Sequence, residues 1–303
     1  MSRRRAPTVA LLTDFGTRDV FVGVVKAVIL REAPQAQVID LTHDVPPGDI
    51  KTAAFRLWQA VPFLPPETVV LAVVDPGVGT ARKAVIVCLP EVTVVCPDNG
   101  LTTYWLAGRQ ISAAGGARGD RRGLPDGVRA FEIAAPPEEA RASSATFHGR
   151  DVFAPAAARL LAGVAPEHLG SPVEELVRLA LPLLAVSPSP PSVRGEILST
   201  DRFGNLASSI GLLRREQAVL NLEPWLPGGQ PVSLPIDGLR VNLAGLSDIP
   251  FARTYAEVPA GALLAYIGSD GLLEIGANRG RAVDLLRPPG SGPLEGTEIV
   301  LSR

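Results

Sequence analysis

The sequence is poor in cysteine, histidine and aromatic residues, and it has no long apolar run. Among 303 residues there are two cysteines and three histidines, and Phe, Trp and Tyr together make up 5%. Two cysteines cannot build a disulfide-rich scaffold, and no H-x-x-x-H pair or Cys-His cluster offers the spacing of a zinc site. No run approaches the length of a membrane span. We therefore expect no bound metal and no membrane-crossing helix.

An excess of charge of either sign is also missing. The chain has 29 basic and 31 acidic residues, a net charge of −2, so we expect no general attraction to nucleic acid or to an anionic membrane. The start "MSRRRAPTVALLTDFG" carries basic residues, but its apolar stretch is too short for a signal peptide. Cys88 and Cys96 follow apolar runs and are predicted to be buried thiols, with a disulfide as the alternative. These features favour a cytoplasmic protein.

The residues that are present predict two domains. Over residues 1–181, short apolar runs such as "TVALL", "QVIDL" and "TVVLAVV" alternate with stretches of helical spacing. This alternation is typical of an α/β domain with a mostly parallel sheet. Residues 182–193 are rich in proline and are predicted to be a linker. Short strand-like runs between turn signals then predict an all-β barrel or sandwich over 194–303.

One segment of the first domain breaks this regular pattern. Residues 108–130 contain the Gly- and Arg-rich stretch "AAGGARGDRRGLPDG". We interpret it as a solvated loop, with an anion site as the alternative.

Acidic residues follow two of the predicted strands. Asp14 and Asp75 are each the first acid after an apolar run. Ligands of open α/β sheets bind beyond the carboxyl ends of the strands, so both side chains are expected to line one crevice, unless each merely caps a turn. The segment "VVDPGVGTAR" (73–82) lacks both the Lys-Ser/Thr pair of a P-loop and the third glycine of a dinucleotide fingerprint. Its glycines are predicted to bring the backbone close to a compact ligand, flanked by Asp75 and Arg82.

Further candidate residues occur in both domains. His148, in "TFHGRDVFAP", precedes a predicted helix and has an Arg and an Asp within three residues, whereas His43 and His168 are expected to be ordinary. In the β domain, two turn segments carry side chains that suit a purine, which needs hydrogen bonds at its edge and a stacking face. These side chains are Asp201, Phe203 and Asn205 in the first turn, and Ser269, Glu274 and Asn278 in the second. Ordinary hairpin chemistry is the alternative for both turns.

Taken together, these segments resemble the S-adenosylmethionine (SAM) hydroxide adenosyltransferase family, which is related to fluorinase and chlorinase. The matching pieces stand in family order: "TDFG" (13–16), "DLTHDVPPGD" (40–49), "VVDPGVGTAR" (73–82), "PDNGLTT" (97–103), "FHGRDVFAP" (147–155), "DRFGN" (201–205) and "SDGLLEIGAN" (269–278). They cover most of the chain outside residues 108–130.

The resemblance implies a Rossmann-like α/β domain, a C-terminal β-barrel and a homotrimer whose sites lie between neighbouring subunits. It assigns Asp14 to the ribose hydroxyls of SAM, and Asp75, Arg82 and His148 to a group of residues that handles water. The methionine portion or the adenine is assigned to five residues of the β domain: Asp201, Phe203, Asn205, Ser269 and Asn278. We add Glu274 to these candidates from the turn pattern.

Departures from the halogenases point to a water-using enzyme. By resemblance, the halogenases carry Tyr at the position of Asp75, Tyr-Ser at His148-Gly149 and Trp at Gly48, and they have an insertion that "VIVCLPEVTVVC" lacks. The expected reaction is hydrolysis of SAM at C5′ to adenosine and L-methionine, without metal or cofactor. The alternatives are halide attack at C5′, a protein that binds adenosine or SAM without turnover, and, more remotely, a nucleoside-processing enzyme with another substrate.

Overall fold

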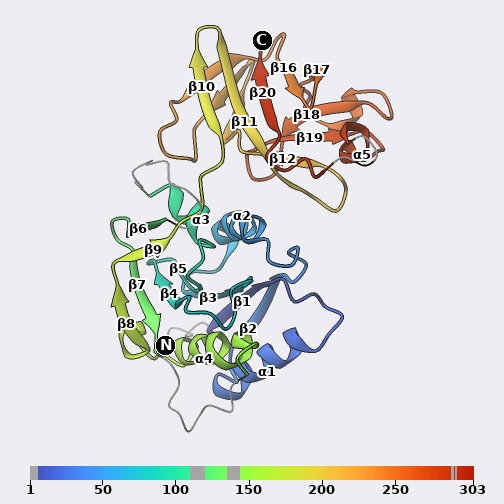
Figure 1. Cartoon of the computed structure of the whole chain (residues 1–303). Helices are drawn as coiled ribbons and strands as arrows, with labels where there is room; N and C mark the ends of the chain where they lie inside the picture. The colour runs from blue at the N-terminus through green and yellow to red at the C-terminus, as the bar shows by residue number, and fades with distance from the viewer. Residues whose placement is uncertain (1–5, 110–119, 135–143, 288–289, 291) are drawn as a thin grey trace, which may run out of the picture. The chain divides into compact units, whose positions relative to one another are not determined.

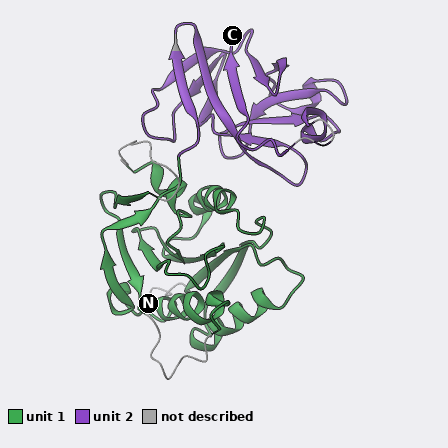
Figure 2. Ribbon diagram, in the orientation of Figure 1, with its two compact units in different colours: residues 1–180 green, residues 181–303 purple. Residues whose placement is uncertain are grey.

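The computed structural model describes residues 6–109, 120–134, 144–287, 290 and 292–303. The chain divides into two compact units, residues 1–180 and residues 181–303 (Figure 2). In the described part of the chain, no helix combines the length and the apolar character that a membrane span requires. Cys88 and Cys96 are free and buried, which excludes the disulfide alternative.

Unit 1 is built on a seven-stranded mixed sheet with the order β2-β1-β3-β5-β4-β7-β8 (Figure 1). The first four strands in this order run parallel, and the remaining pairs are antiparallel. The predicted α/β domain with parallel strands is therefore confirmed. The bounds of its strands are β1 (Thr8–Thr13), β2 (Gln37–Thr42), β3 (Thr68–Val73), β4 (Ala84–Cys88), β5 (Val92–Pro97), β7 (Arg129–Ile133) and β8 (Gly170–Val173), with a separate pair β6 (Arg121–Gly123) and β9 (Glu175–Val177).

Helices cover both faces of this sheet. Figure 1 shows α1 (Phe21–Glu32) and α4 (Ala154–Leu161) on one face, and α2 (Ile50–Ala60) and α3 (Thr103–Ala107) on the other. With both faces covered, every residue of β1 and β3 is buried, which explains why these strands read as unbroken apolar runs. The connections include single turns at Val61–Phe63 and Pro166–His168, and a π-helical turn, Gly149–Phe153, that leads into α4.

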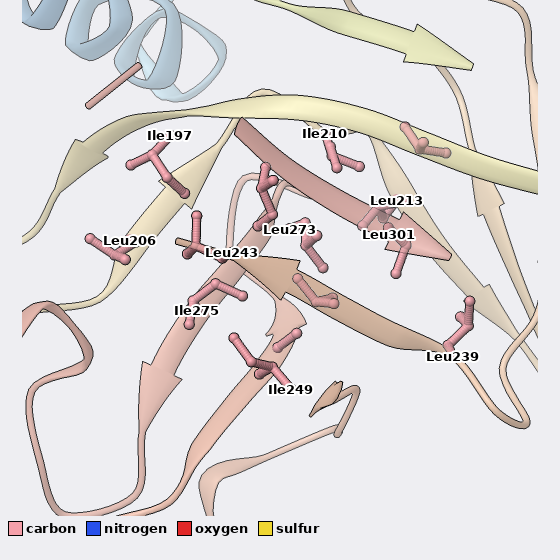
Figure 3. Packing of buried hydrophobic residues seen from close by; sticks show 14 of the residues in the cluster. Ile197, Leu206, Ile210, Leu213, Leu239, Leu243, Ile249, Leu273, Ile275 and Leu301 are labelled. Atoms are coloured by element: carbon pink, nitrogen blue, oxygen red, sulfur yellow. The ribbon is translucent and has the colours of Figure 1, made fainter. Parts of the chain in front are cut away.

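Unit 2 is an antiparallel, nearly closed barrel, so the predicted all-β domain is confirmed. Its main sheet has the order β17-β16-β20-β11-β12-β19-β18, and a bridge between Phe251 and Ala265 brings the two ends of that order together. Figure 3 shows the apolar side chains that fill its interior, among them Ile197, Leu243 and Leu273. The bounds of its elements are β10 (Leu184–Pro188), β11 (Pro191–Thr200), β12 (Leu206–Ser208), β13 (Leu213–Glu216), β14 (Val219–Leu222), β15 (Val232–Pro235), β16 (Arg240–Leu243), β17 (Leu246–Pro250), a turn (Tyr255–Glu257), β18 (Leu263–Ile267), β19 (Leu273–Ala277), α5 (Ala282–Leu286) and β20 (Glu298–Ser302).

Two segments take a form that the sequence pattern does not show. The proline-rich residues 182–193 contain β10 and the start of β11, which pair as an antiparallel hairpin. Pro188, Pro190 and Pro191 stand where the hairpin turns and at the adjoining strand ends, which a sheet tolerates, and Pro182 precedes β10. Within the predicted loop 108–130, residues 110–119 lie outside the described residues, and 121–123 form the short strand β6.

Candidate active site

The turns that follow β1 and β3 lie side by side at the carboxyl edge of the sheet. Asp14, directly after β1, accepts a hydrogen bond on Oδ2 from the backbone N–H of Gly48 at 2.8 Å. Gly48 has a φ of +73°, and a Cβ at this position would lie 3.4 Å from the ring of Pro76. Pro76 is the neighbour of Asp75, which follows β3. Asp14 and Asp75 therefore belong to adjoining turns, as expected for the ends of neighbouring parallel strands.

Asp75, Arg82 and His148 form one hydrogen-bonded group. Arg82 donates from Nε to Asp75 Oδ1 at 2.9 Å, and its Nη2 pairs with Asp75 Oδ2, so the ion pair is bidentate. The same Nη2 lies 2.9 Å from His148 Nδ1. The Arg82 and Asp75 side chains keep only 12% and 6% of their surface exposed. The structure thus brings together the three residues to which the resemblance assigns the handling of the attacking water.

The glycine turn of residues 75–82 closes on itself. The N–H of Val78 donates to the carbonyl of Asp75 at 3.2 Å, and the N–H of Thr80 donates to the carbonyl of Gly77 at 3.1 Å. A phosphate cradle instead points successive N–H groups at the anion. These two donors are used within the turn, which supports the prediction that it presents Asp75 and Arg82 rather than a phosphate site.

His148 stands at the start of the π-helical turn before α4. A π turn is rare and occurs often at functional sites. The next residue, Gly149, allows a close approach, because a Cβ there would lie 2.9 Å from the ring of Phe15 and 3.3 Å from that of Phe147. Phe15 follows Asp14 directly. Because Gly149 has no side chain, the turn that carries His148 can pack closely against the turn that carries Asp14.

The charged residues beside His148 are engaged with each other. Arg150 makes two hydrogen bonds to Asp151, which also accepts from the N–H of Ser144 at 2.9 Å. The hydrogen bond from Arg150 lowers the pKa of Asp151 against the opposing effect of its partial burial. Asp151 is therefore held as a carboxylate by Arg150, and the polar partner of the His148 ring is Arg82.

The contact with Arg82 determines how His148 can act. A guanidinium only donates hydrogen bonds, so Nδ1 of His148 must be the acceptor, and a neutral imidazole then carries its proton on Nε2. Arg82 is also held by the ring of Phe153, 5.1 Å below its guanidinium carbon. One largely buried cation thus orients both the carboxylate, which can accept a proton from water, and the imidazole, whose Nε2–H can donate a hydrogen bond to that water.

In unit 2, the turn of residues 201–205 borders an open pocket of about 600 Å³. Asp201 fixes this turn, since its Oδ1 accepts from the N–H of Asn205 at 2.8 Å and its Oδ2 from Asn205 Nδ2 at 2.9 Å. Phe203 is 68% exposed at the rim. The pocket lining consists of Phe203, Asn205, Tyr255, Ala277, Arg279, Gly280 and Arg281.

The remaining candidates of unit 2 do not line this pocket. Glu274 accepts a hydrogen bond from the hydroxyl of Tyr266 at 2.6 Å, and Asn278 donates from Nδ2 to the carbonyl of Val258 at 2.7 Å. Ser269 lies in the turn that joins β18 to β19. Their roles toward a substrate stay predictions.

Sequence reasoning missed three residues of the pocket: Tyr255, Arg279 and Arg281. The hydroxyl of Tyr255 contacts Asn205 Oδ1 at 3.2 Å and the hydroxyl of Tyr266 at 2.9 Å. The polar residues gathered in "GANRGRA" were the only signal in the sequence for Arg279 and Arg281. The segment "RTYAEV" has no pattern that identifies Tyr255 as a pocket residue. Among the residues that the structure describes, no group of three or more His, Cys, Asp or Glu side chains is placed to hold a metal ion.

The chain is similar to known proteins over most of its length. Two family models match the chain. The model of the SAM hydroxide adenosyltransferase N-terminal domain matches residues 9–170, and the model of the C-terminal domain matches residues 195–289. A Thermus thermophilus protein named (R)-S-adenosyl-L-methionine hydrolase is 44% identical over 288 residues, covering 92% of this chain and 94% of the relative. A fluorinase from an Actinoplanes species is 26% identical over 296 residues, covering 90% and 91%.

A solved structure supports the same comparison. The crystal structure of an uncharacterized conserved protein from Thermotoga maritima matches with a TM-score of 0.76 and 31% sequence identity. The match covers 97% of this chain and 100% of that one, so it includes both units.

Proposed function

The chain belongs to the SAM hydroxide adenosyltransferase family, and from this premise we propose that it hydrolyses SAM to adenosine and L-methionine by attack of water at C5′. The closer named relative is a hydrolase, and the fluorinase is much less similar. The observation that carries the proposal is the bidentate Asp75–Arg82 pair with His148 on the same guanidinium nitrogen. This group can activate a water but is poorly suited to hold a halide beside the Asp75 carboxylate.

The reaction is a displacement at carbon. The water oxygen forms a bond to C5′ while the C5′–S bond breaks, and the electron pair of that bond returns to sulfur, giving the neutral thioether of methionine. The sulfonium already carries a positive charge, so the leaving group needs no acid, metal or cofactor. The water is the weak partner, and it loses one proton as the new bond forms.

We assign the proton transfer to the Asp75–Arg82–His148 group. The Asp75 carboxylate accepts the proton of the water, because Arg82 stays protonated and cannot act as a base. The cation of Arg82 stabilises the hydroxide-like character that develops on the water oxygen. Nε2 of His148, which carries the imidazole proton, orients the water by donating a hydrogen bond to its oxygen.

Substrate binding is proposed to use both units. Asp14 has one oxygen on the Gly48 N–H, and a carboxylate offers further lone pairs to a ribose diol. In unit 2, Phe203 supplies a stacking face and Asn205 an amide edge at the same pocket, the two features that a purine requires. Ser269, Glu274, Asn278 and Asp201 are proposed to contribute to the same binding region.

Three finer points complete the proposal. The named relatives carry the descriptor (R) beside an L-methionine portion, so the descriptor refers to the sulfonium sulfur, and we propose that this epimer is the preferred substrate. We propose a homotrimer, as the family resemblance implies. We also propose a cytoplasmic location, which the two free cysteines support.

Product analysis tests the function. The purified protein is incubated with each sulfonium epimer of SAM, with and without chloride and with and without EDTA, and the products are separated by chromatography. We expect the (R) epimer to give adenosine and methionine in all four combinations of chloride and EDTA, and the other epimer to be turned over more slowly. Formation of 5′-chloroadenosine would favour the halogenase alternative, and tight binding without turnover would favour a binding protein. Loss of activity with EDTA would contradict the metal-free mechanism.

A further inference from the structure

The loop that carries Asp75 and Arg82 passes over the end of a neighbouring strand. It leaves β3 and enters β4, but these strands are not neighbours, since β5 lies between them in the sheet. Residues 74–83 must therefore cross the carboxyl end of β5. Asp75 stands near the start of this crossing loop and Arg82 near its end, so their bidentate pairing requires both ends to be held in place.

The turn after β5 holds both ends. Asn99 donates from Nδ2 to the carbonyl of Val74 at 2.8 Å, one residue before Asp75. The N–H of Asp98 donates to the carbonyl of Lys83 at 2.9 Å, one residue after Arg82. Two consecutive residues of one turn thus fasten the two ends of the crossing loop.

The chemistry of Asn99 fits this position. Its Oδ1 accepts from the N–H of Leu101 at 3.3 Å while its Nδ2 donates to Val74. The partners fix the orientation of the amide, because a carbonyl needs a donor and an N–H needs an acceptor. No other side chain of this size offers both groups, and an aspartate would keep only the contact with Leu101.

The turn itself is rigidly placed in unit 1. Gly100 has a φ of +96°, and a Cβ there would lie 2.8 Å from the side chain of Leu179. The hydroxyl of Thr103 donates to the carbonyl of Gly100 at 2.6 Å and accepts from the N–H of Leu179 at 2.9 Å. The carboxylate of Asp98 accepts from the N–H of Val177 at 2.8 Å. These contacts make the turn a fixed support for the crossing loop.

From this arrangement we propose that Asn99 is a positioning residue for the hydrolysis reaction, and that it sets the place of Asp75 relative to Arg82 through the Val74 carbonyl. It does not touch the reacting atoms. A shift of about 1 Å in a group that handles the attacking water costs on the order of 10²-fold in rate, because the reaction depends on in-line placement of the water. The inference rests on the proposed function.

The test compares Asn99→Asp and Asn99→Ala with Thr103→Val in the full-length protein. Asn99→Asp preserves size and the Leu101 contact but puts a carboxylate oxygen against the Val74 carbonyl. Thr103→Val removes the side-chain hydrogen bond to the Gly100 carbonyl of the same turn but leaves the contact between Asn99 and the Val74 carbonyl in place. We measure kcat and KM for SAM from adenosine formation, together with the midpoint of thermal unfolding.

We expect both Asn99 variants to lose at least roughly tenfold in kcat with KM within about threefold of the wild type. Thr103→Val should lower the unfolding midpoint while keeping the wild-type kcat. Wild-type kcat in Asn99→Asp, or an equal loss of kcat in Thr103→Val at the same loss of stability, would overturn the inference. Absence of adenosine formation by the wild-type protein would instead contradict the proposed function.

Discussion

At the scale of single residues, the Arg82 guanidinium contacts both Asp75, which can take a proton from water, and His148, which can donate a hydrogen bond to that water. It holds Asp75 by two hydrogen bonds and His148 by one. A fixed donor in a largely buried site stabilises developing negative charge without having to reorganise during the reaction. The three side chains are therefore expected to behave as one unit in mutagenesis.

The first prediction concerns this unit. Asp75→Ala, Arg82→Ala and His148→Ala should each lower kcat by roughly 10²-fold or more with little change in substrate affinity, as expected for groups that act on the nucleophile. The double variant Asp75→Ala/His148→Ala should lose far less than the product of the single losses. Steady-state kinetics checks both points, with His168→Ala, an exposed histidine, as the control that keeps full activity. Fully multiplicative losses would show that the residues act independently.

The second prediction concerns Asp14. Its replacement by Ala leaves the ribose hydroxyls without their acceptor, so the affinity for SAM should fall by about 1–3 kcal/mol. Calorimetry in an Asp75→Ala background measures this without consuming the substrate. Asp44→Ala, an exposed acid near the same edge of the sheet, is the control. Unchanged affinity in Asp14→Ala would mean that Asp14 only caps its turn against Gly48.

The third prediction concerns Arg178, which is 5% exposed and whose guanidinium finds no acceptor among the described residues. Burial lowers the pKa of Arg178 to about 10, although the Asp98 carboxylate opposes the effect. Because the folded pKa lies well below the ordinary value of an arginine side chain, the charged side chain destabilises the folded state at every pH below about 10. At about 1.4 kcal/mol per pH unit, this difference corresponds to roughly 3 kcal/mol.

Arg178→Met should therefore raise the free energy of unfolding at pH 7 by up to roughly 3 kcal/mol. The gain should shrink as the pH rises above 10, where the wild-type guanidinium begins to lose its proton in the folded state. Urea denaturation at pH 7 and at high pH measures the effect, with the exposed Arg129→Met as control. A less stable Arg178→Met protein would show that the cation has a partner in the assembled protein.

At the scale of elements, the π-helical turn before α4 brings His148 close to the Asp14 turn. The fourth prediction is that Gly149→Ala, whose new methyl would lie 2.9 Å from the Phe15 ring, destabilises the protein by about 1–3 kcal/mol through overpacking. It should also lower kcat, because the turn carrying His148 must move. The double variant Gly149→Ala/Phe15→Leu should recover part of both losses. Wild-type kcat in Gly149→Ala would show that the close packing of Gly149 against Phe15 is not needed for catalysis.

Much of the fold could be predicted from the sequence because its elements repeat simple patterns. The runs that became β1 and β3 are buried on both faces, and the helix starting after Asp49 has a capping side chain that accepts from the Thr52 N–H at 3.0 Å. Strands such as β6 and β9, of three residues each, carry no periodicity to detect. The hairpin of β10 and β11 was hidden because prolines stand at its turn and at the adjoining strand ends, and because β11 also pairs with β20, more than 100 residues further along the chain.

The candidate site was predicted unevenly for a related reason. Acids that follow buried strands are easy to recognise, so Asp14 and Asp75 could be predicted from the pattern. Arg82 and His148 were also candidates from their local sequence, and the resemblance supplied their common role. The role of Asn99 depends on β5 lying between β3 and β4, and strand order is not written in the local sequence. Tyr255 likewise reaches Asn205 from 50 residues away, which no spacing rule anticipates.

At the scale of the whole molecule, the proposed substrate-binding residues are divided between the two units. The family resemblance implies that each site combines the first unit of one subunit with the second unit of the next. The fifth prediction is that the protein is a trimer by light scattering and that its sites are shared between subunits. Co-expression of Asp75→Ala, altered in unit 1, with Asn205→Ala, altered in unit 2, tests the sharing.

If sites are shared in a ring, random mixing of the two inactive chains restores about a quarter of the sites to the wild-type combination. Activity well above that of either variant alone is therefore expected. Sites formed within one chain would give no recovery, because every chain carries one of the two substitutions. A monomeric protein with full activity would contradict the trimer itself.

The origin of the new oxygen atom tests the central claim most directly. The reaction is run in water enriched in oxygen-18, and both products are examined by mass spectrometry with fragmentation of the ribose. Attack of water at C5′ predicts adenosine with one heavy oxygen at O5′ and unlabelled methionine. Adenosine without label, or labelled homoserine beside methylthioadenosine, would place the attack at another atom and contradict the proposed reaction.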